Sequence, residues 1–164
     1  MAAQRADATL LIEIARSEAN YCPTSFYNLA LQVDSICNEL GITIPVAIHA
    51  DHYGIKSEAD IPFAKMEIPS MFDAGITSIA IDASHMADDK NLLANIELNP
   101  CIPQWAGLET EVGEIKGEQG LSTVDDASFL IKGLNAHGIF ADWIALNNGS
   151  THGLEASGQG IQVE

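Results

Sequence analysis

The sequence predicts a parallel α/β fold, either doubly wound or a piece of a barrel. Apolar runs of strand length recur about every 30 to 36 residues, which is the spacing of repeated βα units. Segments with helical periodicity fill the intervals between these runs. Most of the runs are continuous and not alternating, as in parallel strands that are covered on both faces. With 164 residues, 47% of them hydrophobic, the chain can form one domain, residues 1–164, with a sizeable core.

Five strands and four helices are expected to alternate along the chain. The expected strands are residues 9–15, 44–49, 78–82, 107–112 and 143–147. The expected helices are residues 25–40, 59–74, 88–99 and 125–135. Ser25 can cap the first helix and Gly41 can end it, because glycine favours the left-handed position after a helix. Gly75 is expected to stop the second helix, and Pro100 the third.

The charge and the cysteines exclude several classes of function. Seven basic residues stand against 23 acidic ones, giving a formal charge of −16. This balance argues against nucleic acid and against anionic membranes, but a small phosphorylated substrate remains possible. Cys22, Cys37 and Cys101 do not form a disulfide or zinc-ribbon pattern. The apolar run at residues 8–15 is too short for a signal sequence or a membrane span, so a cytoplasmic protein is expected.

Polar side chains follow each expected strand near its carboxyl end. They are Glu13 and Arg16; His49, Asp51 and His52; Asp82, Ser84 and His85; Glu109 and Glu111; and Asn147, Asn148 and His152. The carboxyl ends of parallel strands lie on one face of the fold, where α/β proteins build their sites. Five separate segments are therefore expected to converge on one site.

The cluster His49-Ala50-Asp51-His52 is the strongest candidate within this set. Polar groups that follow a buried strand are costly to bury unless they are paired or bound to a metal. Histidine is a common zinc ligand, and an aspartate beside a metal is a plausible general base. The alternative is a solvated loop start with an incidental histidine pair.

Other polar residues are open to two interpretations each. Glu109 and Glu111, two apart, should share one face of a strand and could hold a cation, or simply line a water-filled barrel end. His85 is either a satisfied histidine or a supporting partner. His137, before a glycine at a helix end, is interpreted as structural. The glycine-rich segment 113–123 resembles a lid loop, but a disordered connector fits its composition equally well.

Four blocks of the sequence resemble the class II, metal-dependent fructose- and tagatose-bisphosphate aldolases. The blocks are Ile-Pro-Val-Ala-Ile-His-Ala-Asp-His at 44–52, Ile-Asp-Ala-Ser-His-Met at 81–86, Leu-Glu-Thr-Glu-Val-Gly at 108–113 and Asn-Gly-Ser-Thr-His-Gly at 148–153. They match the family's strand-end motifs in order, in spacing and in placement on strands. The resemblance runs from about residue 8 to residue 153, most of the chain.

The resemblance implies a TIM (β/α)8 barrel, of which this chain would supply about five central βα units. It implies a lyase of glycolysis that reversibly cleaves fructose 1,6-bisphosphate to dihydroxyacetone phosphate and glyceraldehyde 3-phosphate. Zn²⁺ is the implied cofactor, with a second divalent or monovalent cation as an alternative. The implied partners are a small sugar phosphate and further copies of the chain, in a dimer or tetramer.

The resemblance also assigns roles to individual residues. Asp51 would be the base and Glu118 the catalytic group of the lid loop. His52 and His152 would be metal ligands, Glu111 and Asp88 would lie at an alternative metal position, and Gly153 would bind the substrate phosphate. The supporting residues would be His49, Asp82, His85 and Glu109.

Two departures from the family pattern leave other functions open. The block that carries the family's third histidine ligand is absent from the sequence, so we expect a partial chain, and Gln119 stands where the lid-loop glutamate would align. These departures favour a non-catalytic or scaffold member of the family. A tagatose-bisphosphate aldolase and a different metal-dependent barrel enzyme, such as a hydrolase or isomerase, are the further alternatives.

Overall fold

A computed structural model describes residues 1–18, 22–113, 121–151 and 154–155 of the chain. Its main sheet has five strands in the order β1-β2-β3-β4-β5, and every neighbouring pair is parallel. The strands are β1 (Leu10–Ala15), β2 (Val46–Gly54), β3 (Ser78–Asp82), β4 (Gly107–Val112) and β5 (Trp143–Leu146). Two short antiparallel strands follow, β6 (Ser150–Thr151) and β7 (Leu154–Glu155).

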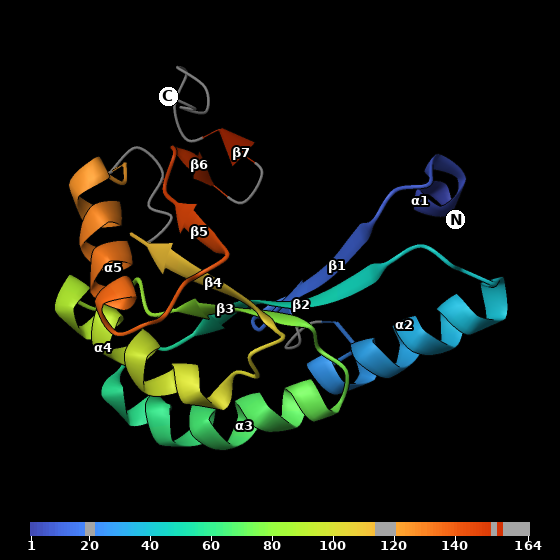
Figure 1. The fold of residues 1–164 in the computed structure, drawn as a ribbon, viewed down its shortest axis with the longest axis horizontal. Helices are drawn as coiled ribbons and strands as arrows, with labels where there is room; N and C mark the ends of the chain where they lie inside the picture. Colours follow the sequence, from blue (N-terminus) through green and yellow to red (C-terminus); the bar gives the residue numbers. More distant parts are fainter. Residues whose placement is uncertain (19–21, 114–120, 152–153, 156–164) are drawn as a thin grey trace.

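One short helix precedes β1, and four longer helices connect the strands of the main sheet. They are α1 (Ala2–Ala6), α2 (Phe26–Leu40), α3 (Ile61–Asp73), α4 (Asp88–Leu98) and α5 (Val124–Ala136), with 3-10 turns η2 (Glu58–Asp60) and η3 (Asn99–Cys101). In Figure 1 the helices α2 to α5 lie along one side of the curved sheet, and the other side is left open. None of the helices in the described ranges is both long enough and apolar enough to cross a membrane.

This arrangement is a half-barrel, with five parallel strands inside and helices outside. It confirms the barrel interpretation and excludes the doubly wound alternative, which needs helices on both faces of the sheet. The chain instead packs one face of the sheet against helices and gives the other face to polar residues.

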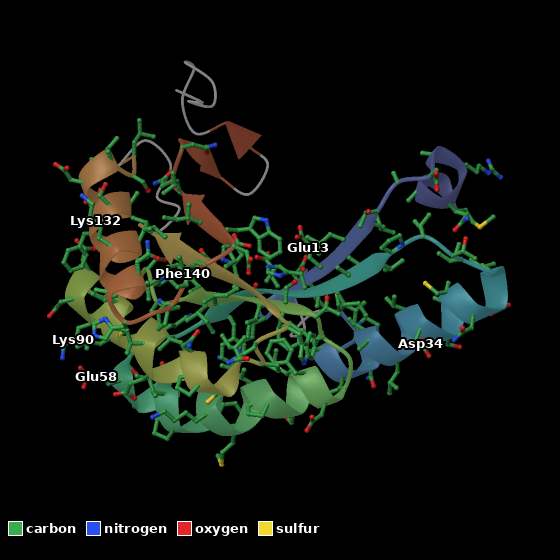
Figure 2. The ribbon with its side chains drawn as sticks, viewed as in Figure 1. Glu13, Asp34, Glu58, Lys90, Lys132 and Phe140 are labelled. Carbon is green, nitrogen blue, oxygen red and sulfur yellow. The ribbon has the colours of Figure 1, made fainter. Side chains whose placement is uncertain are left out.

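The apolar core lies between the sheet and its helices. Ile79 and Ile81 of β3 are fully buried there, together with Ile68 of α3 and Leu134 of α5. Charged side chains of the helices point away from the sheet in Figure 2, where Asp34, Glu58, Lys90 and Lys132 are labelled. The sequence is therefore amphipathic in the sense that a barrel requires, with apolar residues in the layer between strands and helices.

The predicted helix ends are largely confirmed. The Ser25 hydroxyl accepts a hydrogen bond of 3.2 Å from the Asn28 N–H at the start of α2. Gly41 ends α2 with a φ of 60°. His137 stands at the end of α5, where its Nδ1 lies 2.9 Å from the Gly133 carbonyl, in keeping with a structural role. Cys22, Cys37 and Cys101 are all free thiols.

The main difference from prediction concerns β2. The strand continues to Gly54, five residues beyond its predicted end at residue 49. The polar cluster is thus part of the strand itself and does not form a loop start. The short helix α1 was not predicted, and α5 begins one residue earlier than expected, at a capping box formed by Thr123 and Asp126.

Candidate functional site

The candidate site is built around an irregularity in β2. The pairing of β2 with β3 shifts register between Ala50 and Tyr53. Within this interval His52 has a φ of 46°, in the left-handed region that few residues other than glycine adopt. A bulge of this kind redirects a side chain from its regular strand position. It places His52 next to Asp51 at the same cavity, although consecutive residues of a regular strand point to opposite faces.

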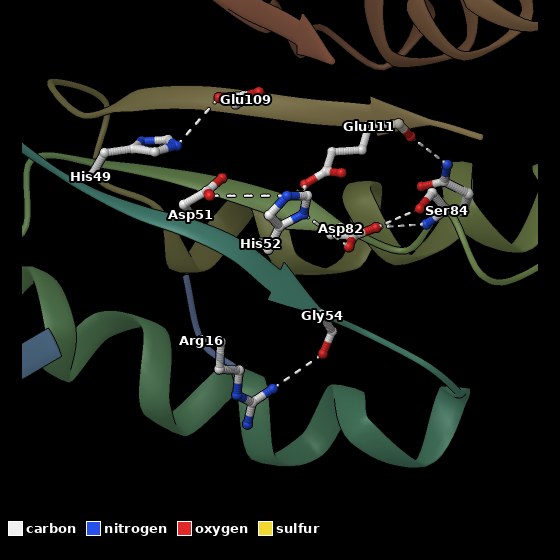
Figure 3. Close-up of polar contacts among 10 residues, drawn as sticks. Arg16, His49, Asp51, His52, Gly54, Asp82, Ser84, Glu109 and Glu111 are labelled. Carbon is white, nitrogen blue, oxygen red and sulfur yellow. Dashed lines mark hydrogen bonds and ion pairs between the residues drawn. The ribbon is translucent and has the colours of Figure 1, made fainter. Parts of the chain in front are cut away.

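Three carboxylates surround the His52 imidazole, as Figure 3 shows. Nδ1 of His52 lies 3.1 Å from Glu111 Oε1 and 3.4 Å from Asp82 Oδ2. Nε2 of His52 lies 3.9 Å from Asp51 Oδ2. The strands β2, β3 and β4 each contribute to this group at their carboxyl ends. The predicted convergence of these three strand ends is therefore present in the fold.

His52, Asp82 and Glu111 strongly influence one another's protonation. The hydrogen bond to Asp82, followed by the contact with Glu111, raises the pKa of His52 from 6.5 to about 11. Burial alone would raise the pKa of Asp82, but hydrogen bonds from His52 and Ser84 outweigh it and lower that pKa. Burial raises the pKa of Glu111, although His52 opposes this shift. The group therefore holds a proton on His52 that a cation would have to displace.

A second polar group surrounds His49, which lies three residues before His52 in β2. The His49 side chain is only 2% exposed. Its Nδ1 is 2.8 Å from Ser78 Oγ, and its Nε2 is 3.2 Å from Glu109 Oε2. The ring of Trp143 meets the imidazole edge-on, with 6.2 Å between ring centroids. His49 is thus fixed on three sides, which suits the supporting position that the sequence suggested.

Hydrogen bonds from neighbouring residues hold the Asp82 carboxylate and the Glu111 backbone in place. The Ser84 hydroxyl and N–H donate to Asp82 Oδ1 at 2.6 Å and 3.1 Å. The Asn91 amide of α4 donates to the Glu111 carbonyl at 2.8 Å. These contacts come from the loop after β3 and from the outer helix layer. They fix the carboxyl ends of β3 and β4 from outside the cavity.

The arrangement fits a metal ion. Asp51, His52 and Glu111 each offer a ligand atom, and these atoms lie within 4.8 Å of one another. The three residues line a cavity of about 90 Å³ together with Glu109, Gly113, Ala145 and Leu146. Within the described part of the chain, Glu111 Oε1 is buried and accepts no hydrogen bond of good geometry. A buried carboxylate oxygen whose near neighbour, His52 Nδ1 at 3.1 Å, is not aligned for a good hydrogen bond is a natural ligand for a cation.

A larger cavity of about 530 Å³ lies elsewhere, at the amino-terminal ends of β4 and β5. Trp105, Phe140 and Trp143 line it, and Asp142 is its one titratable residue. The Asp142 carboxylate already accepts a hydrogen bond of 2.9 Å from the Leu108 N–H. This cavity lacks the ligand set of the site at the carboxyl ends, so we place the candidate chemistry in the smaller cavity.

The structure does not bring every predicted site residue to the cluster. Asp88 begins α4 and is exposed, and His85 is exposed in the turn after β3. Asp82, expected only to support the site, instead contacts His52 directly. Glu118, His152 and Gly153 lie outside the described residues, and the proposed lid loop falls largely in the same undescribed range 114–120.

Two contributors to the site were not singled out from the sequence. Ser78, which binds His49, is the first residue of β3, and Asn91, which binds Glu111, lies in the interior of α4. The available signal for Asn91 was a pair of amides, Asn91 and Asn95, spaced by one helical turn within an otherwise apolar face. Such a pair needs buried partners, which β4 supplies through the Glu111 carbonyl for Asn91 and the Thr110 hydroxyl for Asn95.

Comparison with known proteins gives a consistent result. The family model described as "Fructose-bisphosphate aldolase class-II" matches residues 1–164. A fructose-bisphosphate aldolase of Staphylococcus epidermidis is 31% identical over 123 residues, covering 72% of this chain and 38% of that protein. One of Streptococcus pneumoniae serotype 4 is 29% identical over 161 residues, covering 93% of this chain and 49% of that protein. The chain thus spans half or less of the length of these curated relatives.

Solved structures agree on the fold. The crystal structure of the YdjI aldolase from Escherichia coli aligns with a TM-score of 0.62 and 22% identity, over 92% of this chain and 49% of that one. The fructose-bisphosphate aldolase of Campylobacter jejuni aligns with a TM-score of 0.60 and 18% identity, over 94% and 50%. The half-barrel therefore corresponds to half of an aldolase barrel. By the family model that matches its whole length, the chain is a member of the class-II fructose-bisphosphate aldolase family.

Proposed function

We propose that the protein is a metal-dependent aldolase that reversibly cleaves fructose 1,6-bisphosphate to dihydroxyacetone phosphate and glyceraldehyde 3-phosphate. The observation that carries the proposal is the group Asp51, His52 and Glu111 at the carboxyl ends of β2 and β4, in a chain of this family. A cavity adjoins this group, and the carboxyl ends of strands are where barrel enzymes bind their substrates.

His52 and Glu111 would hold the metal, with His152 as a further ligand and Asp88 near an alternative position. Bound Zn²⁺ would act as a Lewis acid that stabilises the negative charge left on the ketose fragment when the carbon–carbon bond breaks. Asp51 lines the same cavity and would take the proton of the substrate hydroxyl. Glu118 would serve the proton transfer from the lid loop, and Gly153 would bind a substrate phosphate through its N–H.

The experiment is a metal and activity assay on the full-length gene product. About one Zn²⁺ per subunit is expected, as in catalytic zinc sites with three protein ligands, and chelation should abolish cleavage. Fructose and tagatose bisphosphates are tested side by side, because the two sugars differ only in the configuration at one carbon. A protein that binds no metal and cleaves neither sugar would refute the proposal.

Substitution of the proposed base separates its role from that of the ligands. Asp51→Ala should remove cleavage while leaving most of the metal bound. Glu111→Gln is the matched comparison, since it should weaken metal binding as well as cleavage. Loss of metal from Asp51→Ala would mean that Asp51 is a ligand and not the base.

The second candidate is a non-catalytic member of the family, which Gln119 at the position of the lid-loop glutamate favours. Such a protein would bind the metal but show no cleavage of either bisphosphate. The remaining parts of the proposal are a cytoplasmic location and assembly into a homodimer or homotetramer. Fractionation of cells tests the location, and light scattering of the purified protein tests the assembly.

A further inference from the structure

The backbone at His52 needs something to hold it in place. Its φ of 46° is unfavourable for a residue with a Cβ, and the sheet is out of register at the same point. The side chain on this strained residue is the one around which the Asp82 and Glu111 carboxylates gather. Strained backbone persists where surrounding contacts determine it, so the contacts on both sides of His52 are informative.

One residue, Arg16, binds the strand on both sides of His52. The Arg16 N–H donates to the Asp51 carbonyl at 3.1 Å, one residue before the bulged histidine. The Arg16 guanidinium donates through Nη1 to the Gly54 carbonyl, also at 3.1 Å, two residues after it. Figure 3 shows this second contact on the side of β2 opposite the carboxylate cluster. The two ends of the bulge are thus tied to a single residue at the end of β1.

The guanidinium group is itself fixed by the helix layer. It lies over the buried Tyr53 ring at 4.5 Å from the ring centroid, and over Phe63 of α3 at 5.8 Å. Its Nη2 is 3.4 Å from Glu67 Oε2, and the same carboxylate oxygen accepts a hydrogen bond of 2.5 Å from the Tyr53 hydroxyl. A planar group that stacks and donates in two directions suits arginine and not lysine.

We infer that Arg16 is a positioning residue, which holds the left-handed bulge of β2 and thereby directs the His52 imidazole toward Asp82 and Glu111. The inference rests on the proposed function, in which His52 is a metal ligand. Arg16 is not among the residues that line the cavity, so it acts through His52 and not on the substrate. Supporting residues that orient a metal-bound histidine affect affinity without touching the metal.

The test compares Arg16→Met and Arg16→Lys with a matched control in the full-length protein. Arg16→Met keeps the aliphatic stem and the backbone N–H that donates to the Asp51 carbonyl, but it removes the guanidinium donors to Gly54 and Glu67. Arg16→Lys keeps the charge near Glu67. Ser70→Ala is the control, because the Ser70 hydroxyl donates to the Glu67 carbonyl and contacts Tyr27 but not β2. It perturbs the neighbouring helix contacts without touching the bulge.

The measurement is the Zn²⁺ dissociation constant, by competition with a chromophoric chelator, together with the thermal midpoint of each variant. Arg16→Met should weaken binding by about tenfold or more, Arg16→Lys by a smaller factor, and Ser70→Ala by less than about threefold. Cleavage by Arg16→Met should recover when Zn²⁺ is raised, as expected for lost affinity and not for lost chemistry.

Three results would overturn the inference. The first is wild-type affinity in a folded Arg16→Met protein, and the second is an equal loss in Ser70→Ala. The third is failure of both Arg16 variants to fold, because Arg16 would then be a residue of the fold and not of the site. Failure of the proposed function has a different outcome, since it appears in the wild-type protein itself, which would then cleave neither bisphosphate whether or not it binds Zn²⁺.

Discussion

The substitution Asn91→Ala tests how the outer helix layer supports β4. Asn91 is 4% exposed, and its amide donates to the Glu111 carbonyl at 2.8 Å. Its side-chain oxygen accepts from the Asn95 amide at 2.9 Å, and Thr110 donates to the Asn95 oxygen at 3.1 Å. The Asn91→Ala protein therefore leaves two buried polar groups, one carbonyl and one amide N–H, without these partners.

An unpaired buried polar group costs about 1–3 kcal/mol, so two of them predict a loss of about 2–6 kcal/mol in the free energy of unfolding. The Asn95 amide retains a bond of 3.0 Å to the Asn91 carbonyl, which favours the lower part of this range. Thr110→Val is the matched control. It keeps the shape of the side chain and removes one hydrogen bond from the same network, at about 1–2 kcal/mol.

Urea denaturation of the metal-free protein gives both values, provided the slopes of the transitions agree. The double variant should lose less than the sum of the single losses, because Asn95 connects the two sites. A loss below about 1 kcal/mol for Asn91→Ala, or a loss no larger than that of Thr110→Val, would refute the reasoning, since the Glu111 contact would then contribute little.

Three further predictions concern other parts of the fold. The pKa of His52 is raised from 6.5 to about 11, so the protonated imidazole stabilises the metal-free protein fully below pH 6.5, and this contribution is lost as pH rises toward 11. Zn²⁺ must displace that proton, so calorimetry at about pH 8 in buffers of different ionisation enthalpy should detect about one proton released per ion, and release of none would contradict the assignment. Gly107→Ala should lower the free energy of unfolding by about 1–3 kcal/mol, because the added Cβ would lie 2.7 Å from the Trp143 ring, and Trp143→Phe should recover part of that loss in thermal unfolding. Ser25→Ala should cost about 1 kcal/mol in urea denaturation by removing the cap on the Asn28 N–H, whereas Ser25→Asp should cost little; equal losses would mean that the cap contributes nothing.

The helix ends could be predicted because they depend on local chemistry. Ser25 and Gly41 bound α2 as expected, and each acts through its own side chain or its own backbone freedom. The order and parallel pairing of the strands followed from the βα spacing for a similar reason. Short connections through helices leave few other topologies.

The end of β2 could not be predicted in the same way. A run of His49, Asp51 and His52 resembles a loop start, because a strand in a parallel sheet is usually apolar at every position. The strand continues past His52, which adopts a left-handed conformation, and pairing with β3 resumes at Tyr53. Contacts distant in sequence accompany that conformation. No local pattern distinguishes a histidine in this conformation from an ordinary one.

The contrast between Asp82 and Asp88 has a related cause. The two residues are six apart in the sequence, and both come after the apolar residues of β3. Asp82 ends β3 and points to the His52 side, whereas Asp88 begins α4 on the exposed surface. Which aspartate reaches the site depends on where the strand stops and on the direction of its last side chain, and the acidic character of the segment does not reveal either.

Core residues and site residues alternate along β2, so the same strand register determines both the packing of the core and the position of the site. Ile48 and Ala50 belong to the core against the helices, while His49 contacts Glu109 and Asp51 lines the cavity beside it. Deleting one residue early in the strand would exchange these two sets, sending imidazole and carboxylate into the helix layer and isoleucine into the cavity. Insertions and deletions should therefore be tolerated in the loops that flank β2 but not within the strand. Related sequences are expected to differ in the residues of β2 while keeping the number of residues in it.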